Sequence, residues 1–519
     1  MWVKTWNMKE GFLVGGCLLF TGVLLQVAMG PIRWELFAWP VNLVVLFLPL
    51  GTVGVIFALR RKVYAFEWMM HADAAVPCLV YATALTIIMG LTPQVREGGM
   101  PWLSHMLRFW PFVLIWTWMM IISALAALNH ILLWKAKALP FILNHLGVVV
   151  AIVAATLGSA DTQSLHLTAF TGEPEWRAVD DNGTVHEPGL GIELHKFTLE
   201  EYDDGTPKRF ASDITVYTKD GKTVQGTVEV NKPLKANGWK IYQYDYEVKY
   251  GTESHYSVFQ LVRDPWIPWV YIGIFMMIAG ALCLMLFMAP RQGLLKRTTV
   301  VIGFVVMLAL VFLALTWFKS GLRLRSLMPA LQSPWFAPHV IVYMFSYALL
   351  GAATIMAVYM LIRKGKTTEK EINLTDNLVY VGLAFLTFGM LFGALWAKEA
   401  WGTYWAWDPK ETWAAATWLC YLVYLHLRKA KPGKWQAACV ILLVSFVCLQ
   451  ICWWGINYLP SAQGLSIHTY NEEPGHPGKQ RIQRFWKSAF GGGVDDVESF
   501  HDAKIWSLSQ LRNPHLLRF

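Results

Sequence analysis

The chain alternates long apolar stretches with short polar connections over its 519 residues. A helix needs about 20 predominantly apolar residues to cross a bilayer, because the lipid core offers no partners for exposed backbone groups. Stretches of this kind lie near residues 11–30, 37–59, 73–92, 110–134, 138–158, 267–290, 298–317, 338–362, 377–397, 411–427 and 435–459. The pattern predicts a polytopic α-helical membrane protein with about eleven transmembrane helices.

One long polar region, at about residues 160–264, interrupts this series. Asp220-Gly221 and Asn237-Gly238 are typical turn pairs, and short runs rich in β-branched and aromatic residues lie around them. The runs are Ile214–Tyr217, Gly226–Val230 and Lys240–Tyr246. We therefore expect one β-rich domain of about 100 residues, tethered to the membrane at both ends.

The net charge of +9 does not indicate a nucleic-acid partner, because the basic residues cluster between apolar stretches. If the spans alternate in direction, most clusters fall on one side, which the positive-inside rule makes cytoplasmic. They are Lys4 and Lys9; Arg60, Arg61 and Lys62; Lys135 and Lys137; Arg291, Lys296 and Arg297; Arg363, Lys364, Lys366 and Lys370; and Arg428, Lys429, Lys431 and Lys434. Only Lys319, Arg323 and Arg325 disagree. We expect a multi-pass protein of the cell inner membrane, with the β-rich domain, the segment 401–413 and the C-terminal tail on the periplasmic side.

The seven cysteines all lie in apolar stretches, and none belongs to a CxxC or CxxCH motif. Lone cysteines in membrane helices are most often small packing residues. The chain is therefore expected to be neither a thiol oxidoreductase nor a covalent haem carrier.

The most informative segment is 401–413, between two apolar stretches. Its tryptophans and charged residues are Trp401, Trp405, Trp407, Asp408, Lys410, Glu411 and Trp413. Membrane interfaces also collect tryptophan, but this density exceeds that of an interfacial belt. Indole faces stack on flat aromatic ligands and charged groups orient the edges of such ligands. The segment predicts a site for a ligand such as haem, with Lys398 and Lys410 as candidates to pair with its propionates.

Two histidines flank this segment and share its expected side of the membrane. His339 stands at the external start of one span, and His468 follows the last span. Two neutral imidazoles on opposite faces of a porphyrin iron form an axial pair. The alternative is that each is an interfacial histidine hydrogen-bonded to lipid headgroups.

Two other histidines, His426 and His145, lie within spans near the expected cytoplasmic ends. The eighteen residues from Asp408 to His426 correspond to about 27 Å of helix. Ionisable groups inside a membrane are costly and usually functional, so the pair predicts an inner iron site. Each could instead fill a helix interface through one hydrogen bond. His130 and His71 are alternatives to His145 as the partner of His426.

Residues 298–470 resemble the CcsA (ResC) component of System II cytochrome c biogenesis, whose tryptophan-rich signature is called the WWD loop. The matching segments are Leu331–Trp335 with His339, the loop 401–413, Tyr424–Arg428 and Leu459–His468. Residues 138–290 resemble the CcsB (ResB) component through Leu139–His145, Gly238–Tyr246 and Arg263–Trp266. The whole resembles a natural CcsBA fusion, with the N-terminal spans 1–137 and the external tail 471–519 left unassigned.

The resemblance implies a holocytochrome-c synthase, a cytochrome c haem-lyase without a classical catalytic residue. Haem b, bound as substrate, would move from the cytoplasmic side to an external site and form thioether bonds with the CxxCH motif of apocytochrome c. It further implies that His339 and His468 are external axial ligands, that the WWD loop cradles haem, and that His426 and His145 form the transmembrane pair. Separate thiol-reduction proteins and membrane lipid would be the other partners.

Two other functions fit parts of the pattern. A haem exporter or haem chaperone without ligase activity would use the same loop, but it would not need an external β-rich module to receive a polypeptide. A redox subunit that passes electrons to quinone would carry paired histidines within its spans on both sides. The outer pair lies at loop ends here, which favours ligation over transport and transport over electron transfer.

Overall fold

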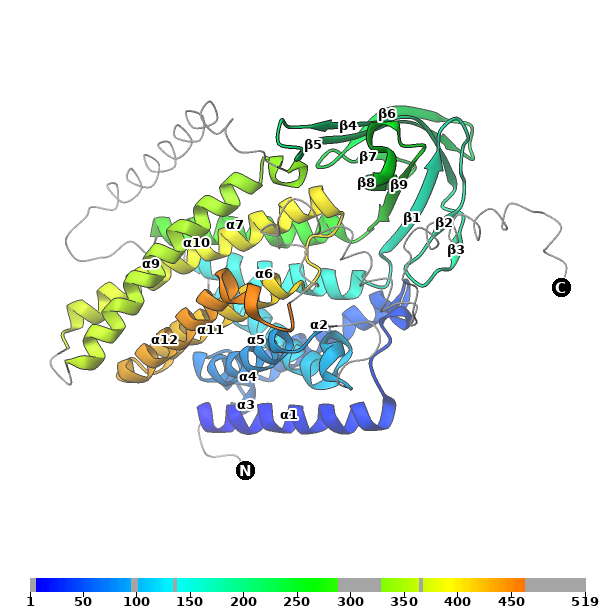
Figure 1. The fold of residues 1–519 in the computed structure, drawn as a ribbon. Coiled ribbons are helices and arrows are strands. Elements are labelled where there is room, and N and C mark those ends of the chain that lie inside the picture. Colours follow the sequence, from blue (N-terminus) through cyan, green and yellow to red (C-terminus); the bar gives the residue numbers. More distant parts are fainter. Residues whose placement is uncertain (1–5, 95–100, 134–137, 288–327, 364–366, 463–519) are drawn as a thin grey trace.

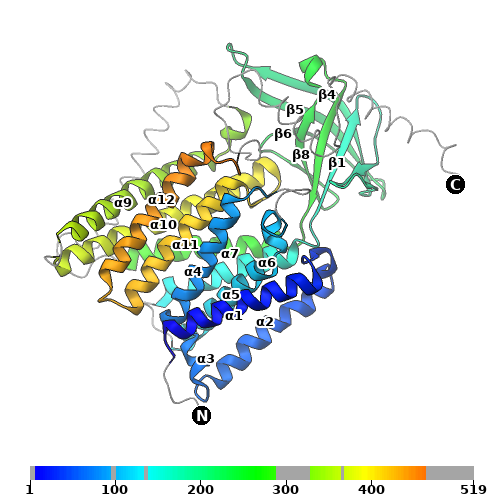
Figure 2. The same cartoon turned by 60° about the horizontal axis from the view of Figure 1, so that its bottom comes forward.

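The computed structural model describes residues 6–94, 101–133, 138–287, 328–363 and 367–462. Long helices pack side by side as a bundle, and a β domain stands at one end of it (Figures 1 and 2). The long helices are α1 (Met8–Met29), α2 (Val41–Leu59), α4 (Ala72–Leu91), α5 (Trp110–Leu132), α6 (Leu139–Gly158), α7 (Ile267–Phe287), α9 (Phe336–Ile362), α10 (Glu369–Trp401), α11 (Pro409–Ala430) and α12 (Trp435–Trp453). A short helix, α3 (Tyr64–Trp68), precedes α4.

The predicted fold class is confirmed: within the described residues, nine helices are long and apolar enough to cross a membrane. Helix α11 has a comparable length but is less apolar, and it is not one of the nine. The span expected at 298–317 lies outside the described residues. Helix α10 is longer than the expected 377–397, because a capping box between Thr368 and Glu371 starts it earlier.

The β domain joins α6 to α7, and it is confirmed as a separate sheet domain. Its strands are β1 (Gln163–Phe170), β2 (Ala178–Val179), β3 (Val185–His186), β4 (Leu190–Glu201), β5 (Pro207–Thr218), β6 (Thr223–Glu229), β7 (Leu234–Ala236), β8 (Trp239–Tyr246) and β9 (Tyr256–Arg263). One sheet has the order β3-β2-β1-β9-β8-β7, and a second has the order β4-β5-β6. The expected strands coincide with parts of β5, β6 and β8, except that Val230 lies one residue beyond the end of β6. Strands β1, β4 and β9 were not foreseen.

The two sheets enclose one apolar core. Leu167 of β1, Ile192 of β4, Val216 of β5, and Phe259 and Leu261 of β9 are all fully buried in it. Alternate residues along these strands point inward, since successive side chains of a strand face opposite sides of the sheet. The domain therefore has its own core rather than borrowing one from the helices.

A carboxylate fastens the membrane end of this domain to the N-terminal helices. Asp161, between α6 and β1, accepts hydrogen bonds of 2.7 Å each from the Trp39 amide, the Asn42 side chain and the Trp266 indole. Partial burial alone would raise the pKa of this carboxyl group. The three hydrogen bonds outweigh that effect and hold the Asp161 pKa below its usual value. They connect α2, α6 and the segment that leads into α7.

Helix α11 lies inside the bundle and packs against α4, α10 and α12. Arg428 forms an ion pair of 3.0 Å with Asp376 of α10, and the Tyr424 hydroxyl donates a 2.6 Å hydrogen bond to the same carboxylate. Near the middle, the Trp418 indole donates to the Thr387 hydroxyl at 3.0 Å. These contacts fix the rotation of α11 about its own axis and therefore the direction of the His426 side chain.

Candidate functional site

The tryptophan-rich loop is the link between α10 and α11. Helix α10 ends at Trp401, and Gly402 follows in the left-handed region with a φ of 73°. Asp408 is the N-cap of α11, since its Oδ1 accepts the Lys410 amide at 2.8 Å. Glu411 completes a capping box by accepting the Asp408 amide at 3.2 Å. Two acidic residues of the loop therefore have a local structural role.

Two of the loop tryptophans pack on the N-terminal helices. Trp413 is buried against α4, and its indole donates a 3.2 Å hydrogen bond to the Gly90 carbonyl. A Cβ at Gly90 would lie 2.8 Å from that indole nitrogen, so glycine allows this approach. Trp407 meets Phe112 and Trp116 of α5 edge to face, with ring centroids 6.0 and 5.6 Å apart. The loop is thus packed against α4 and α5.

Two indole groups beside the loop are buried without a hydrogen-bond partner. The Trp405 ring stands edge-on to Trp407 at 5.8 Å, and its indole nitrogen has no acceptor among the described residues. The same holds for the indole nitrogen of Trp116. A buried donor left unpaired costs about 1–3 kcal/mol. Such unpaired donors beside aromatic rings packed edge to face fit a site that takes a flat ligand with acceptor groups.

His339 is connected to the same loop through aromatic contacts. It lies in the first turn of α9, and its ring is 5.7 Å from the ring of Trp396 on α10. Trp396 in turn lies 5.0 Å from Trp401 at the start of the loop. The structure therefore brings His339 and the tryptophan loop together at one end of the bundle. His468 lies outside the described residues.

The His339 ring is oriented by the backbone of α10. Its Nδ1 lies 2.8 Å from the Gly389 carbonyl oxygen. A carbonyl oxygen only accepts, so in the neutral ring Nδ1 carries the proton and Nε2 keeps the lone pair. This is the tautomer in which a histidine can bind a metal through Nε2, with the Nδ1 hydrogen bond fixing the ring.

His145 of α6 and His426 of α11 meet inside the bundle. Their ring centroids are 6.2 Å apart, with the ring planes at 69°. Each Nδ1 bonds the carbonyl four residues earlier, Phe141 at 2.9 Å for His145 and Leu422 at 2.8 Å for His426. Both Nε2 atoms therefore keep their lone pairs. Two imidazoles that share one metal ion through bonds of about 2.0–2.1 Å place their centroids about 6 Å apart, so the spacing suits an axial pair.

His145 rather than His130 is the neighbour of His426. The Phe141 ring lies between His145 and His130 and stacks on both, with ring centroids 3.8 Å from His145 and 4.0 Å from His130. His130 therefore lies on the far side of the Phe141 ring from His145. His71 is the N-cap residue of α4.

The two candidate sites lie at opposite ends of the bundle. His145 is in the second turn of α6, whose other end leads to the β domain, and His426 is near the end of α11, whose start carries the tryptophan loop. The described residues contain no cluster of three or more metal-ligating side chains. Two histidines are enough for porphyrin iron, because the macrocycle supplies the other four ligands.

The β domain touches the tryptophan loop directly, which the sequence did not predict. The Tyr242 hydroxyl of β8 donates a 3.0 Å hydrogen bond to the Lys398 carbonyl near the end of α10. The buried Lys398 ammonium donates to the Gly402 carbonyl at 2.9 Å and lies 3.6 Å from Asp264. Lys398 is therefore already paired within the protein. Nothing in the sequence indicated this contact, since the two segments are more than 150 residues apart.

Fold and sites define a polytopic membrane protein that carries an aromatic-rich loop, a β domain and two groups of histidines. Comparison with known proteins agrees with this class. Residues 267–462 match the family model of the cytochrome c assembly protein, and residues 136–255 match that of the ResB-like family. Together the two models match more than half of the chain, which belongs to the fused CcsBA type of cytochrome c biogenesis protein.

Curated relatives agree with the assignment to cytochrome c biogenesis. The cytochrome c biogenesis protein CcsA of Chlamydomonas reinhardtii is 42% identical over 162 residues, which cover 29% of this chain and 45% of that protein. The protein of the same name from Guillardia theta is 38% identical over 173 residues, covering 28% and 56%. The chain spans about half the length of these relatives.

Proposed function

We propose that this protein carries haem from an inner site at His145 and His426 to an outer site at the tryptophan loop. There it would promote covalent attachment of haem to the CxxCH motif of an apocytochrome c. Haem b would be bound as substrate. The inner site would face the cytoplasm, and the outer site and the β domain would face the periplasm across the inner membrane.

One observation carries the proposal: the inner histidine pair is built from both family regions. His145 comes from the ResB-like part and His426 from the cytochrome c assembly part, and their rings meet at 6.2 Å. Neither part alone holds two imidazoles there. Ionisable side chains inside a membrane bundle are costly, so a pair in the metal-binding tautomer favours a ligand between them.

The outer site would hold haem for the reaction. Trp405 and Trp407 offer aromatic faces, and the unpaired indole donors of Trp405 and Trp116 could bind acceptor groups of the ligand. His339, with its ring fixed on α10, would supply one axial nitrogen, and His468 would supply the other. The β domain, which contacts the end of α10, stands where an incoming polypeptide would arrive.

The chemistry needs positioning more than acid–base catalysis. Each cysteine S–H adds across a haem vinyl group, with sulfur bonding one vinyl carbon and hydrogen the other. The addition is redox-neutral, so it requires no added oxidant or reductant. Holding two large partners in register supplies the entropic part of the barrier, and the axial imidazoles set the electronic state of the iron. Separate proteins would keep the cysteines reduced.

The inner site can be tested with a matched pair of variants. His145→Ala and His426→Ala should each lower the haem that copurifies with the protein by about tenfold or more. His130→Ala is the control, because it lies at the same end of the bundle and makes the same i−4 backbone bond, but stacks behind Phe141. Equal loss in all three variants would mean that general packing, not ligation, explains the effect.

Ligation can be separated from export in a host that lacks its own cytochrome c maturation proteins. The chain is expressed with a secreted CxxCH reporter, and thioether-bound haem is detected by haem staining after denaturation. A reporter with both cysteines changed to serine is the control. Haem that reaches the external side but never becomes covalently attached would favour the exporter or chaperone function instead.

A further inference from the structure

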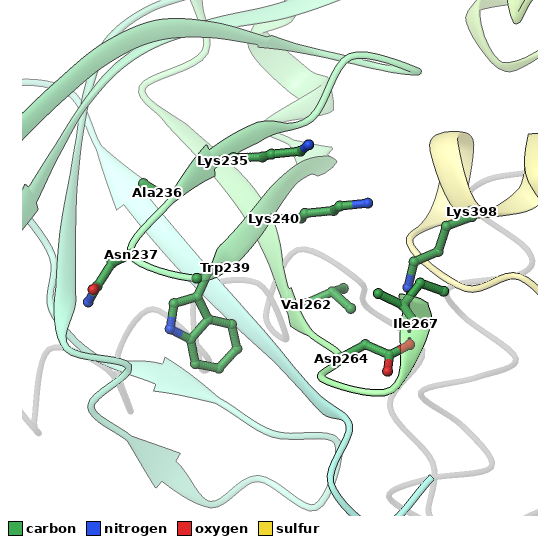
Figure 3. Close-up of a pocket in the computed structure, with 10 residues that line it drawn as sticks. Lys235, Ala236, Asn237, Trp239, Lys240, Val262, Asp264, Ile267 and Lys398 are labelled. Atoms are coloured by element: carbon green, nitrogen blue, oxygen red, sulfur yellow. Dashed lines mark ion pairs between the residues drawn. The ribbon is translucent and has the colours of Figure 1, made fainter. Parts of the chain in front are cut away.

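A pocket of about 370 Å³ lies between the β domain and the ends of the membrane helices (Figure 3). The β7–β8 hairpin forms one wall, with Lys235 and Lys240 extending side by side toward the end of α10. Lys398, near the end of α10, and Asp264, just before α7, form the opposite wall. The lining thus contains three lysines and one carboxylate.

The charges in this pocket do not balance. Lys398 and Asp264 neutralise each other at 3.6 Å, and both side chains are almost completely buried. Glu399, the next acidic group nearby, accepts a 3.0 Å hydrogen bond from the Trp335 indole. Within the described part of the chain, Lys235 and Lys240 form no ion pair. Two lysines of the pocket are therefore left without an ion-pair partner among the described residues, and Asp264 and Glu399 offset the charge of Lys240 only from a distance.

Lys235 and Lys240 also occupy positions where two like charges are unfavourable. Lys235 of β7 and Lys240 of β8 are directly opposite in the strand register. Like charges in such a pair destabilise a hairpin. Burial, with the repulsion from Lys235, lowers the pKa of Lys240, although Asp264 and Glu399 act in the opposite direction. A bound anion would remove this penalty.

The location of the pocket identifies the kind of anion. Ile267 begins α7 and Lys398 lies three residues before the end of α10, and both helices are candidate membrane spans. The ends of spans lie at the level of the lipid headgroups. Val262 and Ile267 add apolar surface beside the two lysines. We propose that this pocket binds the headgroup of an anionic phospholipid, with its phosphate between Lys235 and Lys240.

A haem propionate is the other anion at hand, but the lining does not suit a porphyrin. Trp239 is the only aromatic residue of the pocket lining, and it is buried in the β core with its indole donating to the Pro188 carbonyl at 3.1 Å. No aromatic face of this lining is therefore available for stacking. A lipid headgroup needs only the ammonium pair and an apolar border.

The test compares lipids retained by the purified full-length protein, in native mass spectra taken after reconstitution in equimolar phosphatidylglycerol and phosphatidylcholine. Protein from cells grown without added haem is used, so the result does not depend on the proposed haem chemistry. Two surface lysines near an anionic headgroup correspond to roughly a thirtyfold preference for phosphatidylglycerol. The variant Lys235→Gln/Lys240→Gln should lose most of that preference.

The control variant is Lys219→Gln/Lys222→Gln, which removes two lysines of the same domain that already form ion pairs with carboxylates. It should keep the lipid preference. Elution volume and melting temperature confirm that both variants fold. If the hairpin variant and the control retain the same lipids, the assignment is wrong. In a parallel preparation from haem-supplied cells, a hairpin variant that keeps its lipids but loses copurified haem would assign the pocket to a propionate, which also overturns the lipid assignment.

Discussion

Substitution of Asp408 separates a structural from a ligand-binding role in the tryptophan loop. Its carboxylate caps α11 by accepting the Lys410 amide at 2.8 Å. Alanine at an N-cap costs about 1 kcal/mol, within a range of about 0.5–2 kcal/mol, whereas asparagine caps almost as well as aspartate. Loss of the carboxylate charge near the helix start adds only about 0.3–1 kcal/mol. Asp408→Ala should therefore destabilise the protein measurably, and Asp408→Asn should do so much less.

The assay is thermal unfolding of the purified protein followed by tryptophan fluorescence, with copurified haem measured on the same samples. If Asp408 acts as the cap, stability and haem content fall together in Asp408→Ala and both stay close to wild type in Asp408→Asn. If Asp408→Asn keeps its stability but loses haem as severely as the alanine variant, the reasoning is refuted. In that case the carboxylate contacts the substrate.

Three further predictions follow from single contacts. Tyr242→Phe removes the hydrogen bond to the Lys398 carbonyl and should lower the stability of the β domain interface by about 1 kcal/mol, measured as faster proteolysis of the domain. Lys429→Ala removes a cation–π contact, with the ammonium 5.0 Å from the Phe141 ring that stacks on His145. Such a contact contributes about 0.5–1 kcal/mol, so haem retention should weaken by up to about fivefold, whereas Lys434→Ala should leave it unchanged. The pKa of Asp161 is lower in the folded protein than in the unfolded chain, where it is about 3.9. The stabilising effect of this carboxylate is therefore present above about pH 3.9 and is lost as the pH falls through the folded-state pKa. The melting temperature should drop below about pH 4, and a pH-independent melting temperature would contradict this.

The sequence predicted the helices well, because membrane spans are recognised from the length of an apolar run alone. It was less accurate where polar residues set the boundary. Helix α10 begins eight residues before the expected span, since Thr368 and Glu371 cap it outside the apolar run. The strands β1, β4 and β9 were missed because they carry several polar residues on their outward faces.

For the candidate sites, the sequence predicted how deep each residue lies in the membrane, but not which residues of other helices it contacts. Counting helical rise placed His426 and His145 near the same end of the bundle, and the structure brings their rings into contact. The packing of Trp413 on Gly90 could not be predicted in the same way. Contacts between spans depend on how helices are ordered in the membrane plane, and apolar periodicity along one chain does not encode that order.

The N-terminal helices contribute contacts to the proposed outer site. Neither family model extends over α1 to α5, since the matched regions begin at residue 136. Yet Trp413 is held by the Gly90 carbonyl of α4, and Trp407 is held by two aromatic rings of α5. The loop itself lies at the junction of α10 and α11. In the proposed outer site, the positions of these rings are therefore set in part by α4 and α5, which lie outside the matched family regions. Changes in α4 or α5 should then alter haem binding without touching a histidine.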